Sequence, residues 1–305
     1  RSGLELEGVS ISILDTPLEK STGNDGKFDF SEVYEGTYNV QFSMAGYVDQ
    51  VLEVTIKAGE NTALPFEMTP VDVVVLDDYN GEIVKFLNNN NIPAEERGWD
   101  VIDELGSYQV LYMNGAYTSM GERPGEEEFE ALISSAEENG VSVVFADTWG
   151  ISYGSLRHLW EFRGDPAQYN SDYNSATVRL RVNENHPILA GLEEDTNYDL
   201  HQNGDFVWFN QYSGRHLATV GSTRVGFVGS GVAYKGVSED SAHLLLSTHA
   251  ASPWVSPFNG WLPVQQQILL NGINYIMDAE FGVVSGSVND GEGNPLDVTV
   301  EVVET

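Results

Sequence analysis

The sequence has 305 residues, and its 47 acidic and 14 basic side chains give a formal net charge of -33 at pH 7. Nucleic acids and anionic membranes bind to basic surfaces, so we expect neither as a partner. Cysteine is absent, which excludes disulfides, thiolate metal sites and a cysteine nucleophile. The acidity itself predicts solubility in a salty or calcium-containing medium rather than a specific cation site.

The length favours two domains, each able to bury its own core. No apolar run approaches the roughly 18 residues that a transmembrane helix needs, so we expect no membrane insertion. The sequence starts at Arg1 rather than at an initiator methionine, and no signal peptide precedes it, which favours a mature or excised piece of a longer chain.

Residues 1–70 have the pattern of a small all-β domain. Short segments alternate apolar and polar residues, as strands with one buried face do; they are VSISIL, KFDF, GTYNVQF, VLEVTI and ALPFEM. Turn signals such as Asn24-Asp25-Gly26 separate them. This region therefore predicts a β-sandwich.

Residues 71–280 change to alternating strands and helices. Apolar runs at 71–76, 109–113 and 141–146 are typical of parallel strands that are covered on both faces. Residues 124–138 predict a helix, because apolar residues recur there at helical spacing.

The end of this region predicts one more strand and a closing helix. HLLLS, at residues 243–247, has the composition of a buried strand. The closing helix has four apolar residues on its expected buried face, Leu269, Ile273, Ile276 and Met277. Strands that alternate with crossover helices predict a doubly wound α/β domain over residues 71–280.

Three short motifs lie close together in the first domain: a Thr-x-x-Asp-Gly-x-Phe turn from Thr22 to Phe28, a Gly-Thr-Tyr strand start at Gly36, and the pair Gly46-Tyr47. With these motifs the domain resembles the carboxypeptidase regulatory-like domain, a transthyretin-like β-sandwich. In that family a Gly-x-Val-x-Asp strand comes first, whereas only Arg1, Ser2 and Gly3 precede the corresponding segment here. The resemblance therefore implies a sandwich that lacks its first strand.

Segments of the second domain carry a different resemblance, through YQVLYMNGAY (108–117), NENHPILAGL (183–192) and HLLLSTHAASPW (243–254). Their order and spacing make residues 71–280 similar to the class I glutamine-amidotransferase-like superfamily, in its ThuA-like and protease-appended branches. The resemblance implies a flavodoxin-like sheet. Because the nucleophilic cysteine of that superfamily is absent, we expect a degenerate, non-catalytic domain.

Residues 281–305 resemble the beginning of another regulatory-like sandwich, since Gly-Ser-Val-Asn-Asp is followed by Gly-x-Pro-Leu. The end of this tail, LDVTVEVVET, repeats the pattern of LEGVSISILDT near the start of the chain. The tail therefore predicts either the first strands of a further copy or a donor strand for a neighbouring subunit. The expected interface residues are Val284, Ser285, Gly286, Ser287, Val288 and Asn289 in the tail, and Leu6, Val9, Ile11 and Ile13 in the first domain.

Catalytic candidates come from the resemblance to the amidotransferase-like superfamily. Its nucleophile follows a central strand, where this sequence has Asp147 and Thr148, and its catalytic histidine has a counterpart in His249. A His–Asp pair at the carboxyl ends of the strands could activate water. We favour the alternative that the topology was inherited and the chemistry lost, and that Asp147 or Thr148 caps a helix.

Metal and ligand sites have little support in the sequence. Asp77 and Asp78 end the first apolar run and could hold Mg²⁺ or Ca²⁺, although such residues also start ordinary loops. We expect no cofactor, and calcium is the one ion that the composition would suit. Aromatic residues are numerous near the expected crevice, including Trp149, Trp254 and Trp261, which is typical of sugar-binding surfaces as well as of α/β cores.

The leading functional hypothesis is a non-catalytic structural module of a secreted or cell-surface assembly. Its partners would be copies of itself joined head to tail by β-strand complementation, as a filament, or adjacent repeats of a longer chain. One alternative is an accessory region of a secreted subtilisin-like protease or another hydrolase. A second alternative is a carbohydrate-binding or hydrolytic α/β domain that uses Asp147 and His249.

Overall fold

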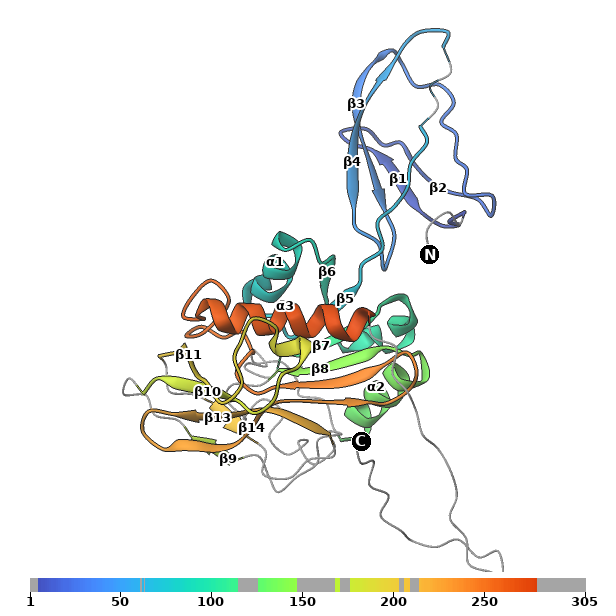
Figure 1. Ribbon diagram of the computed structural model, residues 1–305. Helices are drawn as coiled ribbons and strands as arrows, with labels where there is room; N and C mark the ends of the chain where they lie inside the picture. Colours follow the sequence, from blue (N-terminus) through green and yellow to red (C-terminus); the bar gives the residue numbers. More distant parts are fainter. Residues whose placement is uncertain are drawn as a thin grey trace, which may run out of the picture.

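The computed structural model describes two domains that are joined by a short linker (Figure 1). The first contains a four-stranded sheet and the second a nine-stranded mixed sheet. The described residues are 5–60, 62, 64–114, 126–146, 168–170, 176–202, 206–208 and 214–278.

The sheet of the first domain is antiparallel, with the strand order β2-β1-β3-β4. Its strands are β1 (Ser10–Ile13), β2 (Glu19–Ser21), β3 (Gly36–Ser43) and β4 (Gln50–Ile56). One face is buried because apolar residues alternate along β1 and β3, and its core consists of Val9, Ile11, Ile13, Val40, Phe42, Val54 and Met68.

Two of the predicted strands of this domain do not form. Residues 27–30 and 64–68 lie outside any strand, although their side chains alternate between exposed and half-buried or, at Met68, buried positions as strand residues do. Phe28 and Phe66 pack against the core without a neighbouring strand to pair with. The domain is therefore sandwich-like, with one regular sheet and a second layer of irregular backbone.

The sheet of the second domain combines a parallel and an antiparallel half. Its order is β11-β10-β13-β14-β15-β8-β7-β5-β6, and the last five strands run parallel to one another. The parallel strands are β5 (Val73–Leu76), β6 (Ala94–Arg97), β7 (Val110–Asn114), β8 (Ser142–Ala146) and β15 (Ala242–Leu246). The antiparallel strands are β10 (Val178–Val182), β11 (Asn197–His201), β13 (Arg215–Ser222) and β14 (Gly226–Gly236).

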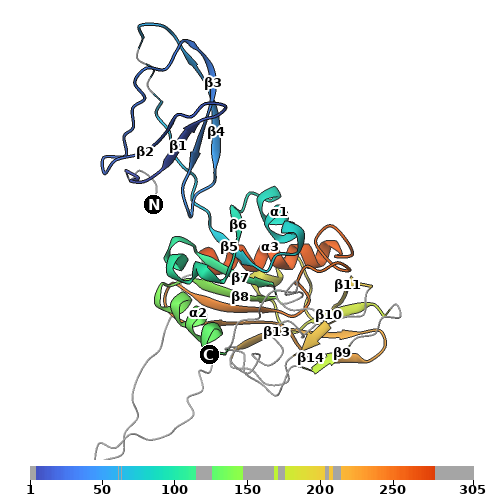
Figure 2. The ribbon, with the colours of Figure 1, turned by 180° about the vertical axis from the view of Figure 1, so that it is seen from behind.

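Helices cover both faces of the parallel half, as the uninterrupted apolar runs predict. The helices α1 (Glu82–Asn89) and α3 (Pro263–Asp278) pack on one face, and the 3-10 helix η2 (Trp99–Ser107) and α2 (Glu126–Glu138) pack on the other. Both views show α1 and α3 on the opposite side of the sheet from α2 (Figures 1 and 2). Successive residues of β5 face opposite sides of the sheet. Val73 packs on the side of α1 and α3, and Val74 packs on the side of η2 and α2.

The remaining elements are short. They are the 3-10 helices η1 (Tyr79–Gly81) and η4 (Pro187–Leu189), and a separate ladder of β9 (Gln168–Asn170) with β12 (Phe206–Trp208). In the described part of the chain, no helix is long and apolar enough to cross a bilayer.

The doubly wound prediction holds for the parallel half of the sheet. The three apolar runs and HLLLS form its strands, and Leu269, Ile273 and Ile276 of α3 are buried, whereas Met277 is half-buried. The antiparallel half was not predicted, because strands such as RHLATVGS mix polar and apolar residues without strict alternation. The edge strand β6 was missed for the same reason, since its sequence is AEER.

The turn between β3 and β4 contacts the second domain. The N–H of Val71 donates to the carbonyl of Gly46 at 2.9 Å, and Val48 N–H donates to the carbonyl of Thr69 at 2.8 Å. Gly46 has a φ of 76°, and a Cβ there would lie 3.0 Å from Cβ of Ser107 at the end of η2. Glycine therefore permits both the backbone conformation and the close approach of the two domains.

Candidate functional site

Asn114 ties together the loops at the carboxyl ends of the parallel strands. It is fully buried at the end of β7, where its amide donates to the carbonyls of Asp77 at 2.7 Å and Ala251 at 3.1 Å. Its side-chain oxygen accepts from the N–H of Ala251 at 2.7 Å. These three bonds satisfy the amide within the fold, so Asn114 fixes the loops after β5 and β15 rather than facing a ligand.

Asp78 caps the helix α1. Its carboxylate accepts from the N–H of Ile83 at 3.0 Å and of Val84 at 2.8 Å. Burial, opposed by these two bonds, raises the pKa of Asp78 to about 6. Asp77, the other candidate metal ligand, has a left-handed backbone with a φ of 56° at the end of β5. Within the described residues, no group of three or more histidine, aspartate or glutamate side chains is placed to hold a metal ion.

His249 is fully buried in the second domain. Its Nε2 donates to the carbonyl of Gln265 at 3.0 Å, and its Nδ1 contacts the hydroxyl of Thr248 at 3.2 Å. Burial lowers the pKa of His249 to about 3, and its ring packs against Trp261 at 5.3 Å. With both nitrogens engaged and the neutral form favoured, His249 is placed as a packing residue. Asp147 and Thr148, its expected partners, lie outside the described residues.

The aromatic residues of the expected crevice divide into buried and exposed ones. Trp208 and Trp261 are buried, whereas Trp254 is 50% exposed and Phe258 49% exposed on the loop before α3. Trp149 lies outside the described residues. Phe258 lies beside Phe86 of α1, and Lys85 approaches its ring at 5.1 Å, so α1 supports this side chain.

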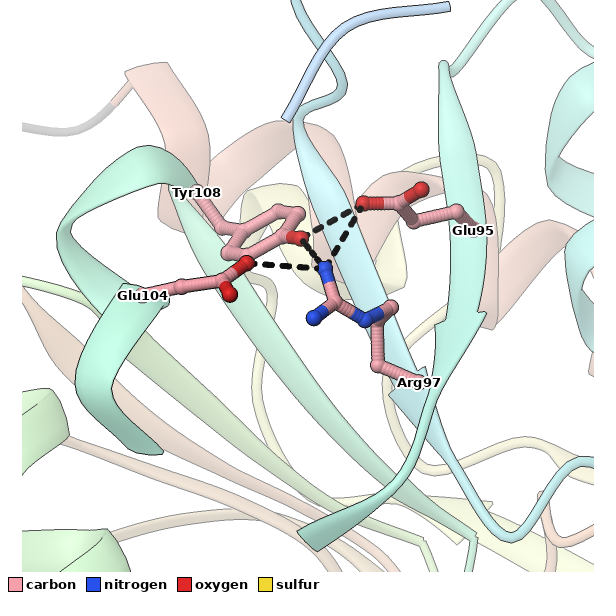
Figure 3. A network of polar contacts seen from close by, with 4 residues as sticks. All are labelled: Glu95, Arg97, Glu104 and Tyr108. Carbon is pink, nitrogen blue, oxygen red and sulfur yellow. Dashed lines mark hydrogen bonds and ion pairs between the residues drawn. The ribbon is translucent and has the colours of Figure 1, made fainter. Parts of the chain in front are cut away.

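A cluster of polar side chains that sequence reasoning missed holds the edge strand β6 (Figure 3). Arg97 donates to Glu104 of η2 at 3.0 Å and to the hydroxyl of Tyr108 at 3.1 Å, and Tyr108 donates to Glu95. Desolvation, followed by the bond to Glu95, raises the pKa of Tyr108, and the bond to Glu104 raises that of Arg97. The charged network reaches from β6 across β5 to Tyr108 and to Glu104 of η2, and so holds the edge strand to the rest of the domain (Figure 3).

A cavity of about 810 Å³ is lined mainly by the first domain, including Phe42 of its sheet and Leu64 and Phe66 of its second layer. Its apolar lining consists of Leu6, Val9, Phe28, Phe42, Leu64, Phe66 and Met68, and its acidic lining consists of Glu5, Asp25, Glu67 and Asp72. Phe42 stacks on Phe66 at 4.1 Å and meets Phe28 edge-on at 5.8 Å. The cavity is half-open to solvent, and Asp72 and Gln109 of the second domain form part of its wall.

The expected interface residues of the first domain fall into two groups. Leu6 and Val9 line the cavity, as an acceptor site requires. Ile11 and Ile13 do not, because they lie in β1, which already pairs with β2 on one side and β3 on the other. Backbone pairing of an added strand with these two residues is therefore not expected, and their place in an interface stays a prediction. The expected donor residues, Val284 to Asn289, lie outside the described residues.

The sequence signal for the cavity-lining residues is the alternation of apolar and polar residues in KFDF and ALPFEM. This alternation predicts two strands but does not show which strands they would pair with. Phe28, Leu64, Phe66 and Met68 come from these two segments.

Comparison with known proteins supports the assignment of the first domain. Residues 1–76 match the model of the CarboxypepD_reg-like domain family, which confirms the resemblance seen in the sequence. The chain is also 23% identical over 202 residues to Colossin-B of Dictyostelium discoideum. The aligned region covers 59% of this chain and 5% of that protein. This chain thus spans about a twentieth of the length of that relative.

A solved structure, the glutaminase domain of Trypanosoma brucei CTPS with bound acivicin, matches 70% of this chain and 96% of its own. The identity is 9% and the TM-score 0.34.

Proposed function

We propose that this chain is a non-catalytic structural module of a secreted or cell-surface assembly, in which units join head to tail through a β-strand. The observation that carries the proposal is the cavity of about 810 Å³ in the first domain, bordered by segments outside any strand. A half-open cavity with apolar lining, bordered by segments that alternate in burial, favours the addition of a strand from elsewhere.

Two forms of the assembly are open. In a tandem array, the tail of one unit begins the first domain of the next within the same long chain, and a unit on its own would keep both the tail and the acceptor, so it too would form multimers. In a filament of separate subunits, the tail leaves its own subunit and completes its neighbour, and such heterologous contacts extend without limit unless they close into a ring. The match to a small part of Colossin-B shows that a segment similar to this one occurs inside a much longer chain.

One added strand would contribute backbone hydrogen bonds and apolar burial to the joint. A six-residue strand makes roughly five or six backbone hydrogen bonds, each with a net value of about 0.5–1.5 kcal/mol. Burial of Val284 and Val288 would add about 1.5–3 kcal/mol for each side chain. The buried environment of His249 supports the non-catalytic part of the proposal, since neither ring nitrogen is left to act on a substrate.

The test compares the full chain with a variant that lacks residues 279–305. We expect the full chain to form multimers whose mass rises with concentration, in light scattering and electron microscopy, and the shortened chain to remain monomeric. A chain with the same tail residues in shuffled order is the control for charge and length. A full chain that stays monomeric at every concentration would overturn the proposal.

A further inference from the structure

We infer that the cavity of the first domain is the acceptor site for residues 283–289 of a second copy of this chain, bound as a β-strand. This inference rests on the proposed function and names the two surfaces that would form the joint. It is carried by the backbone of the cavity walls and by the sequence of the tail.

The cavity is bordered by two segments that lie outside any strand and whose side chains alternate in exposure as those of a strand do. In residues 64–68, Leu64 and Phe66 are half-buried and Met68 is buried, whereas Pro65 and Glu67 are exposed. Residues 28–30 show the same alternation. Within the described residues, neither segment belongs to a ladder or to an isolated bridge. Proline at position 65 fits this assignment, because proline in sheets is confined to edges, ends and bulges.

The other edges of this domain are poorer acceptors. β2 is three residues long and its residues, Glu19 to Ser21, are exposed and polar, so a strand added there would bury little apolar surface. The outer edge of β4 presents Val51, which is 53% exposed and does not line the cavity. A strand at the cavity would instead pack its side chains against Phe28, Phe42 and Phe66.

The tail contains one segment whose chemistry fits the cavity. Residues 283–289, VVSGSVN, carry no charge, and Val284 and Val288 fall on the same face of a strand with Gly286 between them. Ser285, Ser287 and Asn289 fall on the opposite face. The cavity is lined by four carboxylates, Glu5, Asp25, Glu67 and Asp72, which would repel an acidic strand. Residues 296–305 contain three acidic residues and are therefore the poorer occupant.

Cysteine cross-linking tests this joint directly, because the chain has no cysteine of its own. A Leu64→Cys chain is mixed with a chain that carries either Val284→Cys or Val288→Cys, and the mixture is oxidised mildly. We expect a disulfide-linked dimer from at least one of these pairs, formed at least ten-fold faster than in the controls. The acceptor control is Val51→Cys, and the donor controls are Ser285→Cys and Ser287→Cys on the opposite face of the strand.

A binding measurement checks the same joint without oxidation. A labelled peptide of residues 281–290 is titrated with the chain that lacks residues 279–305. We expect binding that is weakened at least ten-fold by Val284→Asp with Val288→Asp in the peptide, and much less by Ser285→Asp with Ser287→Asp. Leu64→Glu in the chain should weaken binding as well, whereas Val51→Glu should not. Circular dichroism and thermal melting of each chain variant confirm that it is folded.

The outcomes separate this inference from the proposed function. Multimers that need the tail, but show no preference for Leu64 over Val51 in cross-linking, would overturn the acceptor site and leave the proposed function standing. A chain with both Leu64→Cys and Val288→Cys that links only within itself would overturn the second copy as the donor. A monomer at every concentration would overturn the proposed function itself.

Discussion

The two domains close their cores in different ways. In the second domain, helices cover both faces of the parallel strands, and Val144 and Phe145 of β8 are fully buried on opposite sides. In the first domain, one face of a four-stranded sheet is covered by irregular backbone and a cavity remains. The comparison shows that an alternating sequence forms a strand only where a neighbouring strand is available, since GTYNVQF pairs on both sides and ALPFEM on neither.

The distribution of tryptophan allows the two domains to be followed separately. All six tryptophans of the sequence lie after residue 70, at positions 99, 149, 160, 208, 254 and 261. Tryptophan fluorescence therefore reports on the second domain, and hydrogen exchange of β3 and β4 amides reports on the first.

The largest expected difference concerns the removal of a phenylalanine from each core. Phe145→Ala should lower the free energy of unfolding of the second domain by about 3–5 kcal/mol, because the ring is fully buried in a closely packed core. Phe66→Ala should cost the first domain only about 1–2 kcal/mol, since its ring is half-buried beside the cavity. Urea unfolding and hydrogen exchange measure the two values. Equal losses would contradict the difference in packing.

Removal of a buried polar side chain should likewise lower the free energy of unfolding more in the second domain than in the first. Asn114→Ala leaves three backbone groups without their partner, and we expect a loss of about 2–4 kcal/mol in the second domain. Thr22→Val removes bonds to Leu6 and Val9 in the first domain, with an expected loss of about 1–2 kcal/mol. Asn139→Ala, on the surface of the second domain, is the control and should change stability by less than about 0.5 kcal/mol. If Asn114→Ala left the free energy of unfolding unchanged, the loops would be held by other contacts.

Enlarged side chains should have opposite effects in the two cores. Val144→Leu adds a methylene to a filled core and should cost about 1–3 kcal/mol, whereas Val9→Leu can extend into the cavity and should be neutral or stabilising. Thermal unfolding, followed by the two probes, measures both. If Val9→Leu were as costly as Val144→Leu, the cavity would not be accessible to added volume.

The smallest expected effect is a pH dependence confined to the second domain. The pKa of Asp78 rises from 3.8 to about 6 on folding, so the stability linked to its protonation is present at low pH and is lost as the pH rises through 6. Between pH 5 and 7.5 this loss should amount to about 1 kcal/mol. It is measured as the difference in urea unfolding between the wild type and an Asp78→Asn variant, which cancels the effect of the other carboxylates. A difference that is constant with pH would contradict the shifted pKa.

Much of the second domain could be predicted because its signals are local. Runs such as VDVVVL and the helical spacing of α2 identify buried elements without knowledge of their neighbours. The antiparallel half escaped prediction because its strands are selected by pairing, as between Arg215 and Tyr234, and not by hydrophobic pattern.

The candidate sites were harder to predict because they depend on partners distant in sequence. The position of His249 after an apolar strand suggested a catalytic group, but its neighbours Gln265 and Trp261 come from a later segment and bury it. The cavity of the first domain is likewise lined by residues that are distant in sequence, such as Phe28 and Leu64, so no single segment reveals it.

The hydrogen bonds of Val71 to Gly46 and of Val48 to Thr69 have a mechanical consequence. They hold the turn between β3 and β4 against the linker between the two domains. A rotation of one domain is therefore passed to the other and is not absorbed by a flexible linker. In a series of such units every joint would repeat the same rotation. A constant rotation that does not return to its starting point produces a helix with a fixed pitch.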